Sequence, residues 1–301
     1  MKRHIALLLA LVMCLGLLCS CTKKEEQTPP ATDNQGESGQ TDNKKEEEKV
    51  EKIYVDFSEK HKDNLYDIKD KIKINGRCLF DEEKGILAAW SNSGIEFAGW
   101  FDGNIRLYFT SSVYVPVPYY VVVDGDYENA KNVELTPQKA YISLANVEKG
   151  YHTIGIYKVD GANTSSSMYL TEIEYKGKLD QSPIEKSMKI EILGDSISCG
   201  IGLVSPKYDD DAYYSYGAIA ARNLNADLSI VAVGGWGISC GVKSFENVIP
   251  RIFDLTCYFA DKEQKWDFEN NQVDAVIVNL GTNDYLEYAN KEDRFELHNA
   301  L

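Results

Sequence analysis

Histidine is scarce in this sequence, with 4 residues in 301. No Cys-x-x-Cys spacing occurs either, so neither a zinc ribbon nor a thiol redox motif is indicated. These shortages disfavour a histidine-ligated metal centre, and the sequence implies no cofactor. Basic residues are also in deficit, because 32 Lys and Arg stand against 47 Asp and Glu, giving a net charge of −15. An acidic surface repels phosphates, so nucleic acid is disfavoured as a partner.

The N-terminal apolar run, Ile5 to Leu18, is too short to cross a bilayer, which takes about 20 apolar residues. Because Met1-Lys-Arg-His4 precedes it, the run predicts a signal peptide over residues 1–21. Leu18-Cys-Ser-Cys21 resembles a bacterial lipobox, and the resemblance implies lipidation at Cys21. An ordinary secretory signal with two incidental cysteines is the alternative.

Residues 22–52 contain almost no large apolar side chain. Such a segment cannot offset its ordering entropy by burial, so it is predicted to be a disordered tether. With a lipid at Cys21, the tether would hold a folded body off a membrane. We therefore expect an extracytoplasmic protein, lipid-anchored to a bacterial membrane or cell surface.

Four cysteines lie beyond the predicted tether: Cys78, Cys199, Cys240 and Cys257. Outside the cytoplasm they can form two disulfides, with three connectivities. A Cys199–Cys240 pair is preferred because each follows a predicted active-site loop. Buried thiols are an equally open alternative.

Short segments with strand character fill residues 53–178, and many alternate apolar with polar side chains. The segments are 72–74, 94–97, 105–109, 119–124, 141–144, 152–158 and 169–175. Turns are predicted at Asp102-Gly-Asn104, Asp124-Gly-Asp126, Lys149-Gly150 and Asp160-Gly161. This spacing, without a convincing helix, predicts an antiparallel β-sandwich or jelly roll. The Tyr-rich stretch 114–120 is interpreted as one of its strands in preference to a sugar-binding platform.

A polar linker at 176–187 separates this region from an α/β region over residues 187–301. Three nearly continuous apolar segments predict buried parallel strands over 189–193, 228–233 and 273–280. A helix is predicted over 213–224, capped by one of the residues 209–211, and another over 285–301. Each strand ends in a Gly-containing loop, at the strand ends where such sheets build their sites.

The three loops carry the residues that acyl transfer requires. Ser196, on the sharp turn after the first strand, can present its hydroxyl as a nucleophile. Gly235 or Gly237 offers an unobstructed backbone N–H to an oxyanion, and Asn283 offers a side-chain amide to the same oxygen. Trp236 beside them either stacks on a sugar ring or packs under the loop.

The same loops resemble blocks I, II and III of the SGNH/GDSL hydrolases. Gly194-Asp-Ser196, the glycine after the second strand, and Gly281-Thr-Asn-Asp284 carry the resemblance. The segments 192–200, 214–216 and 278–284 are similar to carbohydrate esterase family 2, as are Gly76-Arg77 and Trp266-Asp-Phe268. That family carries a jelly roll before its three-layer α/β/α hydrolase domain, so the resemblance covers nearly everything after the tether.

The resemblance assigns roles by position. It implies Ser196 as nucleophile, with its own N–H, the Gly235 N–H and the Asn283 side chain as the oxyanion hole. Asp195 and Asp284 are interpreted as loop supports, and a metal pair made of them is disfavoured because no ligand spacing accompanies them.

The family's catalytic histidine, in an Asp-x-x-His block, has no counterpart here. His4 falls in the predicted signal peptide, His61 and His152 fall in or before the sandwich, and His298 lies in the final predicted helix. None is expected to reach Ser196 as a general base. We therefore expect the sequence to be a fragment of a longer esterase with an incomplete hydrolase domain.

The favoured hypothesis is an acetyl-xylan esterase that removes O-acetyl groups from polysaccharide through an acyl-enzyme on Ser196. One alternative is a glycan-binding surface lipoprotein with a degenerate hydrolase domain, and another is an SGNH lipase or thioesterase. The expected partners are an acetylated polysaccharide or oligosaccharide and, through Cys21, a membrane. No protein partner can be inferred.

Overall fold

The computed structural model describes residues 54–110, 116–161, 168–181, 184–203 and 210–289. The predicted signal peptide, Cys21, the tether, His4 and His298 lie outside these residues. Within the described ranges, no helix combines the length and apolar character needed to cross a membrane. The described residues belong to one compact unit, which contains the sheets described below.

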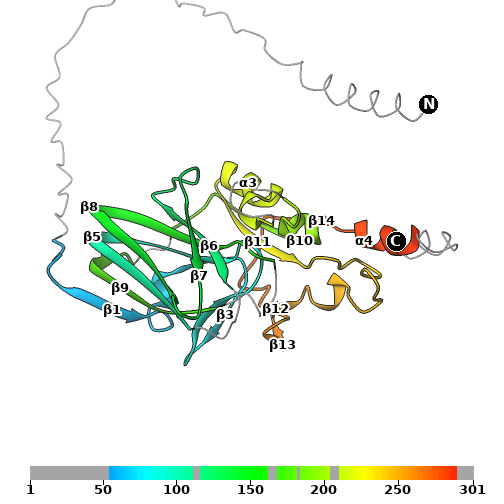
Figure 1. Cartoon of the computed structure of the whole chain (residues 1–301), viewed down its shortest axis with the longest axis horizontal. Coiled ribbons are helices and arrows are strands. Elements are labelled where there is room, and N and C mark those ends of the chain that lie inside the picture. The colour runs from blue at the N-terminus through cyan, green and yellow to red at the C-terminus, as the bar shows by residue number, and fades with distance from the viewer. Residues whose placement is uncertain (1–53, 111–115, 162–167, 182–183, 204–209, 290–301) are drawn as a thin grey trace, which may run out of the picture. The chain divides into compact units, whose positions relative to one another are not determined.

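The first region is a curled antiparallel sheet of nine strands within the described residues (Figure 1). The strands are β1 (Lys60–Asn64), β2 (Lys73–Asn75), β3 (Cys78–Asp81), β4 (Gly85–Ala88), β5 (Gly94–Thr110), β6 (Val117–Val123), β7 (Lys131–Leu135), β8 (Tyr141–Lys158) and β9 (Tyr169–Leu179). Their order is β3-β4-β9-β5-β8-β6-β7, with β1 paired to β9 and β2 to β5. A single-turn 3-10 helix, η1 (Lys69–Lys71), precedes β2. The predicted antiparallel β-region is confirmed, and its jelly-roll topology stays a prediction.

Two of the predicted turns are wrong. Asp102-Gly-Asn104 lies inside β5, and Lys149-Gly150 lies inside β8, where Gly150 pairs with Phe101. The pairing register shifts on both sides of Gly103, so these residues form an irregularity in a long strand. A strand bulge uses the same Gly and Asn residues as a hairpin turn, and local sequence does not separate the two. The turn after Val123 is confirmed, because the Asp126 N–H donates to the Val123 carbonyl.

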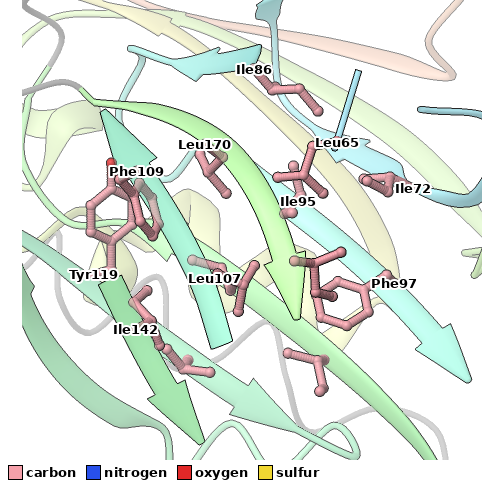
Figure 2. Packing of buried hydrophobic residues seen from close by; sticks show 14 of the residues in the cluster. Leu65, Ile72, Ile86, Ile95, Phe97, Leu107, Phe109, Tyr119, Ile142 and Leu170 are labelled. Atoms are coloured by element: carbon pink, nitrogen blue, oxygen red, sulfur yellow. The ribbon is translucent and has the colours of Figure 1, made fainter. Parts of the chain in front are cut away.

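The core of this sheet is one apolar cluster, part of which Figure 2 shows. The residues labelled there are Leu65, Ile72, Ile86, Ile95, Phe97, Leu107, Phe109, Tyr119, Ile142 and Leu170. Burial of each such side chain stabilises the fold by about 1.5–3 kcal/mol. Tyr119 and Tyr120 of the Tyr-rich stretch are both buried in β6, which confirms the strand interpretation for them. Residues 111–115 lie outside the described part.

The second region is a parallel sheet in the order β11-β10-β14. It consists of β10 (Met188–Gly194), β11 (Ala226–Ala232) and β14 (Ala275–Asn279), so the three predicted strands and their parallel pairing are confirmed. The prediction that all three are buried is wrong for β14, an edge strand of this sheet, where Val276, Ile277 and Val278 are exposed. Helix α2 (Ser196–Cys199) follows β10, α3 (Tyr216–Asn223) precedes β11, and α4 (Thr282–Ala289) follows β14. The three-layer arrangement of the related hydrolases stays a prediction.

Two predicted helix starts need correction. Asp211 caps a separate 3-10 turn, η2 (Ala212–Tyr214), and the Ser215 hydroxyl caps α3 by accepting from the Ala218 N–H. The last helix begins at Thr282 rather than at residue 285, so it includes Asn283 and Asp284. Short polar side chains such as Asp211 and Ser215 bond to nearby backbone N–H groups and so divide the chain into separate turns. The apolar periodicity used to predict the helices does not show such divisions.

A buried ion pair joins the two sheets. Arg77, between β2 and β3, donates to Glu191 on β10 over 3.0 Å from Nε and 2.8 Å from Nη2. Its Nη1 donates to the carbonyls of Phe253 and Leu255. These carbonyls flank the start of β12 (Leu255–Cys257), which pairs with β13 (Asp261–Lys265) after the 3-10 turn η3 (Ile249–Arg251). One guanidinium therefore ties three parts of the chain together.

Candidate active site

The carboxyl ends of the three parallel strands meet at one edge. Gly194 at the end of β10 pairs with Ala232 of β11 and with Asn279 of β14. The loops that follow these strands begin from adjacent positions, so the three predicted site segments are brought together.

Ser196 opens the one-turn helix α2. Asp195 is its N-cap, with extended backbone and a carboxylate that accepts the Ile197 N–H over 3.0 Å. This cap places Ser196 at a helix N-terminus, where backbone N–H groups have no intrahelical acceptor. Ser196 is half-buried, whereas Asp195 is buried. Burial raises the pKa of the Asp195 carboxyl, although the Ile197 N–H opposes this shift.

The Gly234–Gly237 loop lies against the serine. A Cβ placed on Gly234 would come within 3.8 Å of the Ser196 Cβ. The Gly237 N–H donates to the Asn247 carbonyl over 3.2 Å, so it is engaged within the loop. The Gly235 N–H has no hydrogen bond to a described residue, and the space beside its Cα is open within 4 Å. This geometry favours Gly235 over Gly237 as an oxyanion donor, and the role itself stays a prediction.

Asn283 lies in the first turn of α4 and is buried. Its Nδ2 donates to the Trp236 carbonyl over 2.7 Å and makes a longer 3.4 Å contact with Asp195 Oδ2. The amide therefore links all three loops. Binding an oxyanion would require only the weaker of these two contacts to open.

Asp284 organises the loop after β11. Its buried carboxylate accepts the N–H groups of Ile238, Ser239 and Cys240, and the Ser239 hydroxyl. Burial by itself would raise the pKa of Asp284, but these hydrogen bonds outweigh it and hold the pKa below its ordinary value.

Replacing Asp284 by Asn is expected to lower the free energy of unfolding at pH 7 by about 2–3 kcal/mol, because hydrogen bonds to a buried carboxylate are lost. A folded-state pKa below the unfolded value gives stability that is present above the unfolded pKa and is lost as pH falls through the folded pKa. Urea unfolding between pH 7 and pH 2 checks this, and the acid-dependent loss should be smaller in the variant. Equal pH profiles for the two proteins would contradict the assignment.

Two neighbouring glycines give a matched pair of alanine variants. A Cβ on Gly237 would overlap the Cys240 carbonyl oxygen and the Asp284 carboxylate, whereas a Cβ on Gly235 meets no atom within 4 Å. Gly237→Ala should therefore destabilise the protein by about 3 kcal/mol. Gly235→Ala should cost about 1–2 kcal/mol, only for its φ of +80°. Thermal melts of both variants test this order, and a more costly Gly235→Ala would refute it.

Trp236 is half-buried and packs on two aromatic residues that the sequence reading did not single out. Its ring lies 5.5 Å from Tyr258 in an edge arrangement and 6.3 Å from Phe259, centroid to centroid. The ring therefore packs under the loop and remains partly exposed beside Gly235. The adjacent aromatic residues Tyr258 and Phe259 are the sequence feature from which an aromatic contact near the site could have been predicted.

Tyr216 is another residue whose position near the site was not predicted from the sequence. Its hydroxyl lies 2.9 Å from Ser198 Oγ on α2 and accepts the Asn279 Nδ2 over 3.2 Å. The hydroxyl thus connects the start of α3 with the serine-bearing turn and the end of β14. The sequence feature that points to Tyr216 is the segment 214–216, which is similar to carbohydrate esterase family 2 but does not by itself indicate a role.

The preferred Cys199–Cys240 disulfide is wrong, because Cys78, Cys199, Cys240 and Cys257 are buried thiols. Cys199 packs with Ala218 and Ala221 against the parallel sheet, whereas the Cys240 N–H is bound by Asp284 in the loop.

The described histidines are engaged in the antiparallel sheet. His61 stacks on Tyr175 at 5.1 Å, and His152 pairs with Asp124 over 2.8 Å. Among the described residues, neither histidine has a contact with Ser196.

Residues 190–300 match the family of GDSL-like lipases and acylhydrolases. This segment contains Ser196, Gly235 and Asn283. It is a GDSL-like acylhydrolase domain. The GDSL-like domain thus begins within β10 and includes all three strand-end loops.

Relatives of the chain extend the comparison beyond the GDSL-like domain. The cellulase/esterase CelE of Acetivibrio thermocellus is 30% identical over 228 residues, which are 71% of this chain and 26% of that protein. An acetylxylan esterase / glucomannan deacetylase of Cellvibrio japonicus is 30% identical over 112 residues, or 35% of this chain and 31% of that protein. The chain thus spans less than a third of the length of these two curated relatives.

Solved structures show the same similarity. The acetyl xylan esterase Est2A of the rumen bacterium Butyrivibrio proteoclasticus superposes with a TM-score of 0.65 at 25% identity, over 76% of this chain and 66% of that one. A family two carbohydrate esterase of Clostridium thermocellum, solved with cellohexaose, gives 0.56 at 27% identity, over 71% and 66%. The antiparallel sheet and the GDSL-like domain therefore occur together in family 2 carbohydrate esterases.

Proposed function

We propose that the protein is a secreted, lipid-anchored esterase that removes O-acetyl groups from a polysaccharide such as xylan. One observation carries the proposal: Ser196, the open Gly235 N–H and the Asn283 amide converge at the carboxyl edge of the parallel sheet. The similarity to esterases named for acetylxylan supports the substrate class. A jelly roll at residues 53–178, a three-layer hydrolase domain from residue 187, and lipidation at Cys21 belong to the same proposal.

The reaction would proceed by acyl transfer. The Ser196 Oγ attacks the acetyl carbonyl carbon while a general base takes its proton, and a tetrahedral oxyanion forms. The N–H groups of Ser196 and Gly235 and the Asn283 amide would bind this oxyanion, each donor contributing about 3–4 kcal/mol to transition-state binding. Collapse breaks the bond to the sugar oxygen, which takes the proton from the general base and leaves as a hydroxyl. Water then attacks the acetyl-serine and releases acetate.

The Trp236 ring would contribute a partly exposed apolar wall beside the oxyanion site. Because its other contacts are Tyr258 and Phe259, the ring is held in place before substrate arrives. A fixed aromatic face suits the CH groups of a pyranose ring. This placement favours a sugar ester over a long-chain acyl ester.

Acetate release from acetylated xylan by the full-length gene product tests the function. A series of p-nitrophenyl esters, from acetate to octanoate, is the companion assay. The proposal predicts acetate release from the polysaccharide and a steady fall in kcat/KM with acyl chain length. Binding of xylan without acetate release would instead support a glycan-binding lipoprotein, and a preference for octanoate would support a lipase.

A further inference from the structure

A second cavity lies at the opposite end of the parallel strands from Ser196. Its volume is about 600 Å³, which is within the range of small-molecule sites. Lys189 and Asp227, at the amino ends of β10 and β11, line it together with Ile74 and Cys78 of the antiparallel sheet. Trp266, just after β13, closes another side. The cavity is therefore separate from the three catalytic loops.

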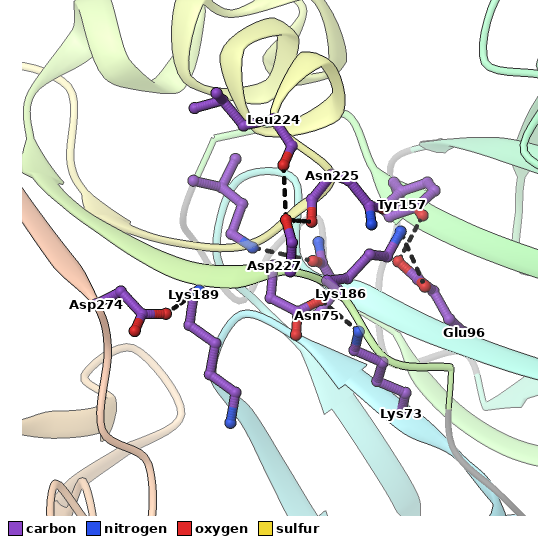
Figure 3. Close-up of polar contacts among 12 residues, drawn as sticks. Lys73, Asn75, Glu96, Tyr157, Lys186, Lys189, Leu224, Asn225, Asp227 and Asp274 are labelled. Atoms are coloured by element: carbon purple, nitrogen blue, oxygen red, sulfur yellow. Dashed lines mark hydrogen bonds and ion pairs between the residues drawn. The ribbon is translucent and has the colours of Figure 1, made fainter. Parts of the chain in front are cut away.

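Lysines gather around this cavity although the protein is acidic overall. Three of them have carboxylate partners: Lys73 lies 2.5 Å from Asp227, Lys186 lies 3.4 Å from Glu96, and Lys265 lies 2.6 Å from Asp254. Figure 3 shows the first two pairs beside the start of β10.

Lys189 is the exception. Its backbone N–H donates to Asp274 Oδ2 over 2.7 Å, while its side chain extends away from that carboxylate (Figure 3). Within the described residues, no carboxylate lies within 4.0 Å of its ammonium group. Of the four lysines that line the cavity in the described part of the chain, Lys189 is therefore the one without a carboxylate partner, although Glu185 and Asp267 line the same cavity.

The remaining lining suits a sugar. Trp266 supplies aromatic surface. The Arg77 guanidinium, which is paired with Glu191, lies 5.0 Å from the centre of the Trp266 ring and helps to hold the ring in place. Gln264 and Asn271 add amide groups that can exchange hydrogen bonds with hydroxyls, and the carboxylates of Glu185 and Asp267 can accept hydrogen bonds from them. The described lining contains no arginine that could make the bidentate contact favouring phosphate, and the nearby Arg77 is already saturated by Glu191 and two carbonyls.

We propose that this cavity binds a carboxylate-bearing sugar, a uronic acid unit of the polysaccharide, with its carboxylate on Lys189. The proposal rests on the polysaccharide substrate proposed above and adds a second contact remote from Ser196. A chain held there would bring acidic, substituted polysaccharide to the enzyme in preference to neutral polysaccharide.

Isothermal titration of the full-length chain carrying Ser196→Ala tests this without turnover. The ligands are a xylotriose bearing one glucuronate group and neutral xylotriose. The acidic ligand should bind about tenfold more tightly, as expected for one hydrogen bond to a charged group. Lys189→Gln should abolish the preference. Lys131→Gln, an equivalent change at an exposed lysine on β7, should leave it intact.

Equal affinity for the two ligands, no binding of either, or an unchanged preference in Lys189→Gln would overturn the proposal. Its failure is separable from failure of the esterase function, because acetate release by the protein with Ser196 intact is measured independently. If the protein releases acetate but does not prefer the acidic ligand, only the cavity proposal is contradicted. If the protein prefers the acidic ligand but releases no acetate, only the proposed esterase function is contradicted.

Discussion

Replacing Ser196 by alanine is expected to reduce acetylesterase turnover by at least about 10⁴-fold, the usual cost of losing a nucleophile that acts together with its base. The fold should be unaffected, because Ser196 is half-buried and its backbone position is held by the Asp195 cap rather than by its own hydroxyl. The measurement is kcat/KM for p-nitrophenyl acetate on the full-length gene product, with a thermal melt of both proteins.

An exposed serine provides the control for this variant. Ser58→Ala removes the same hydroxyl at a site near the start of the antiparallel sheet, where the hydroxyl contacts only Asp56 among the described residues. Its turnover should equal that of the parent protein. Equal turnover by Ser196→Ala and the parent would eliminate the proposed mechanism.

Removing the Arg77 guanidinium is expected to give the largest loss of stability. Arg77 is fully buried, and its charge is compensated by Glu191, which also accepts the Ser229 hydroxyl over 2.9 Å. Arg77→Met would leave the Glu191 carboxylate buried without its partner. Breaking such a pair from one side costs about 3–5 kcal/mol. Urea unfolding at pH 7 measures the change.

The Glu191→Leu variant and the double variant complete a thermodynamic cycle. Because each single change leaves one uncompensated charge, the double change should cost less than the sum, with a coupling energy of about 1–3 kcal/mol. The double variant still loses the hydrogen bonds to the carbonyls of Phe253 and Leu255. Strict additivity, or a cost below about 1 kcal/mol for Arg77→Met, would show that the pair does not hold the sheets together.

Local patterns predicted the parts of the fold that depend on near neighbours. The apolar runs ending in Gly194 and Asn279 form neighbouring parallel strands, as their patterns predicted, although Val276, Ile277 and Val278 of the second run are exposed. The glycine-containing loops after these runs carried the candidate site residues. The choice of Gly235 over Gly237 could be stated as a preference only. It is the hydrogen bond from the Gly237 N–H to Asn247, ten residues away, that distinguishes the two.

Long-range pairing explains what the sequence did not reveal. Arg77 and Glu191 are 114 residues apart, and no periodicity indicates that they meet. The same holds for the Arg77 guanidinium and the rings of Trp266 and Phe268, at 5.0 and 5.2 Å. In the sequence, Gly76-Arg77 and Trp266-Asp-Phe268 carry a family resemblance but no assigned role. The structure gives them one, the joint between the two sheets and a wall of the second cavity.

The central claim is that Ser196 is the acylated nucleophile of an esterase. Mass spectrometry of the full-length gene product after reaction with a fluorophosphonate tests it most directly, because this reagent traps a serine that is activated for acyl transfer. The account predicts a single modified residue, Ser196, with modification and loss of acetylesterase activity proceeding in parallel. Complete loss of activity with an unmodified Ser196 would contradict it.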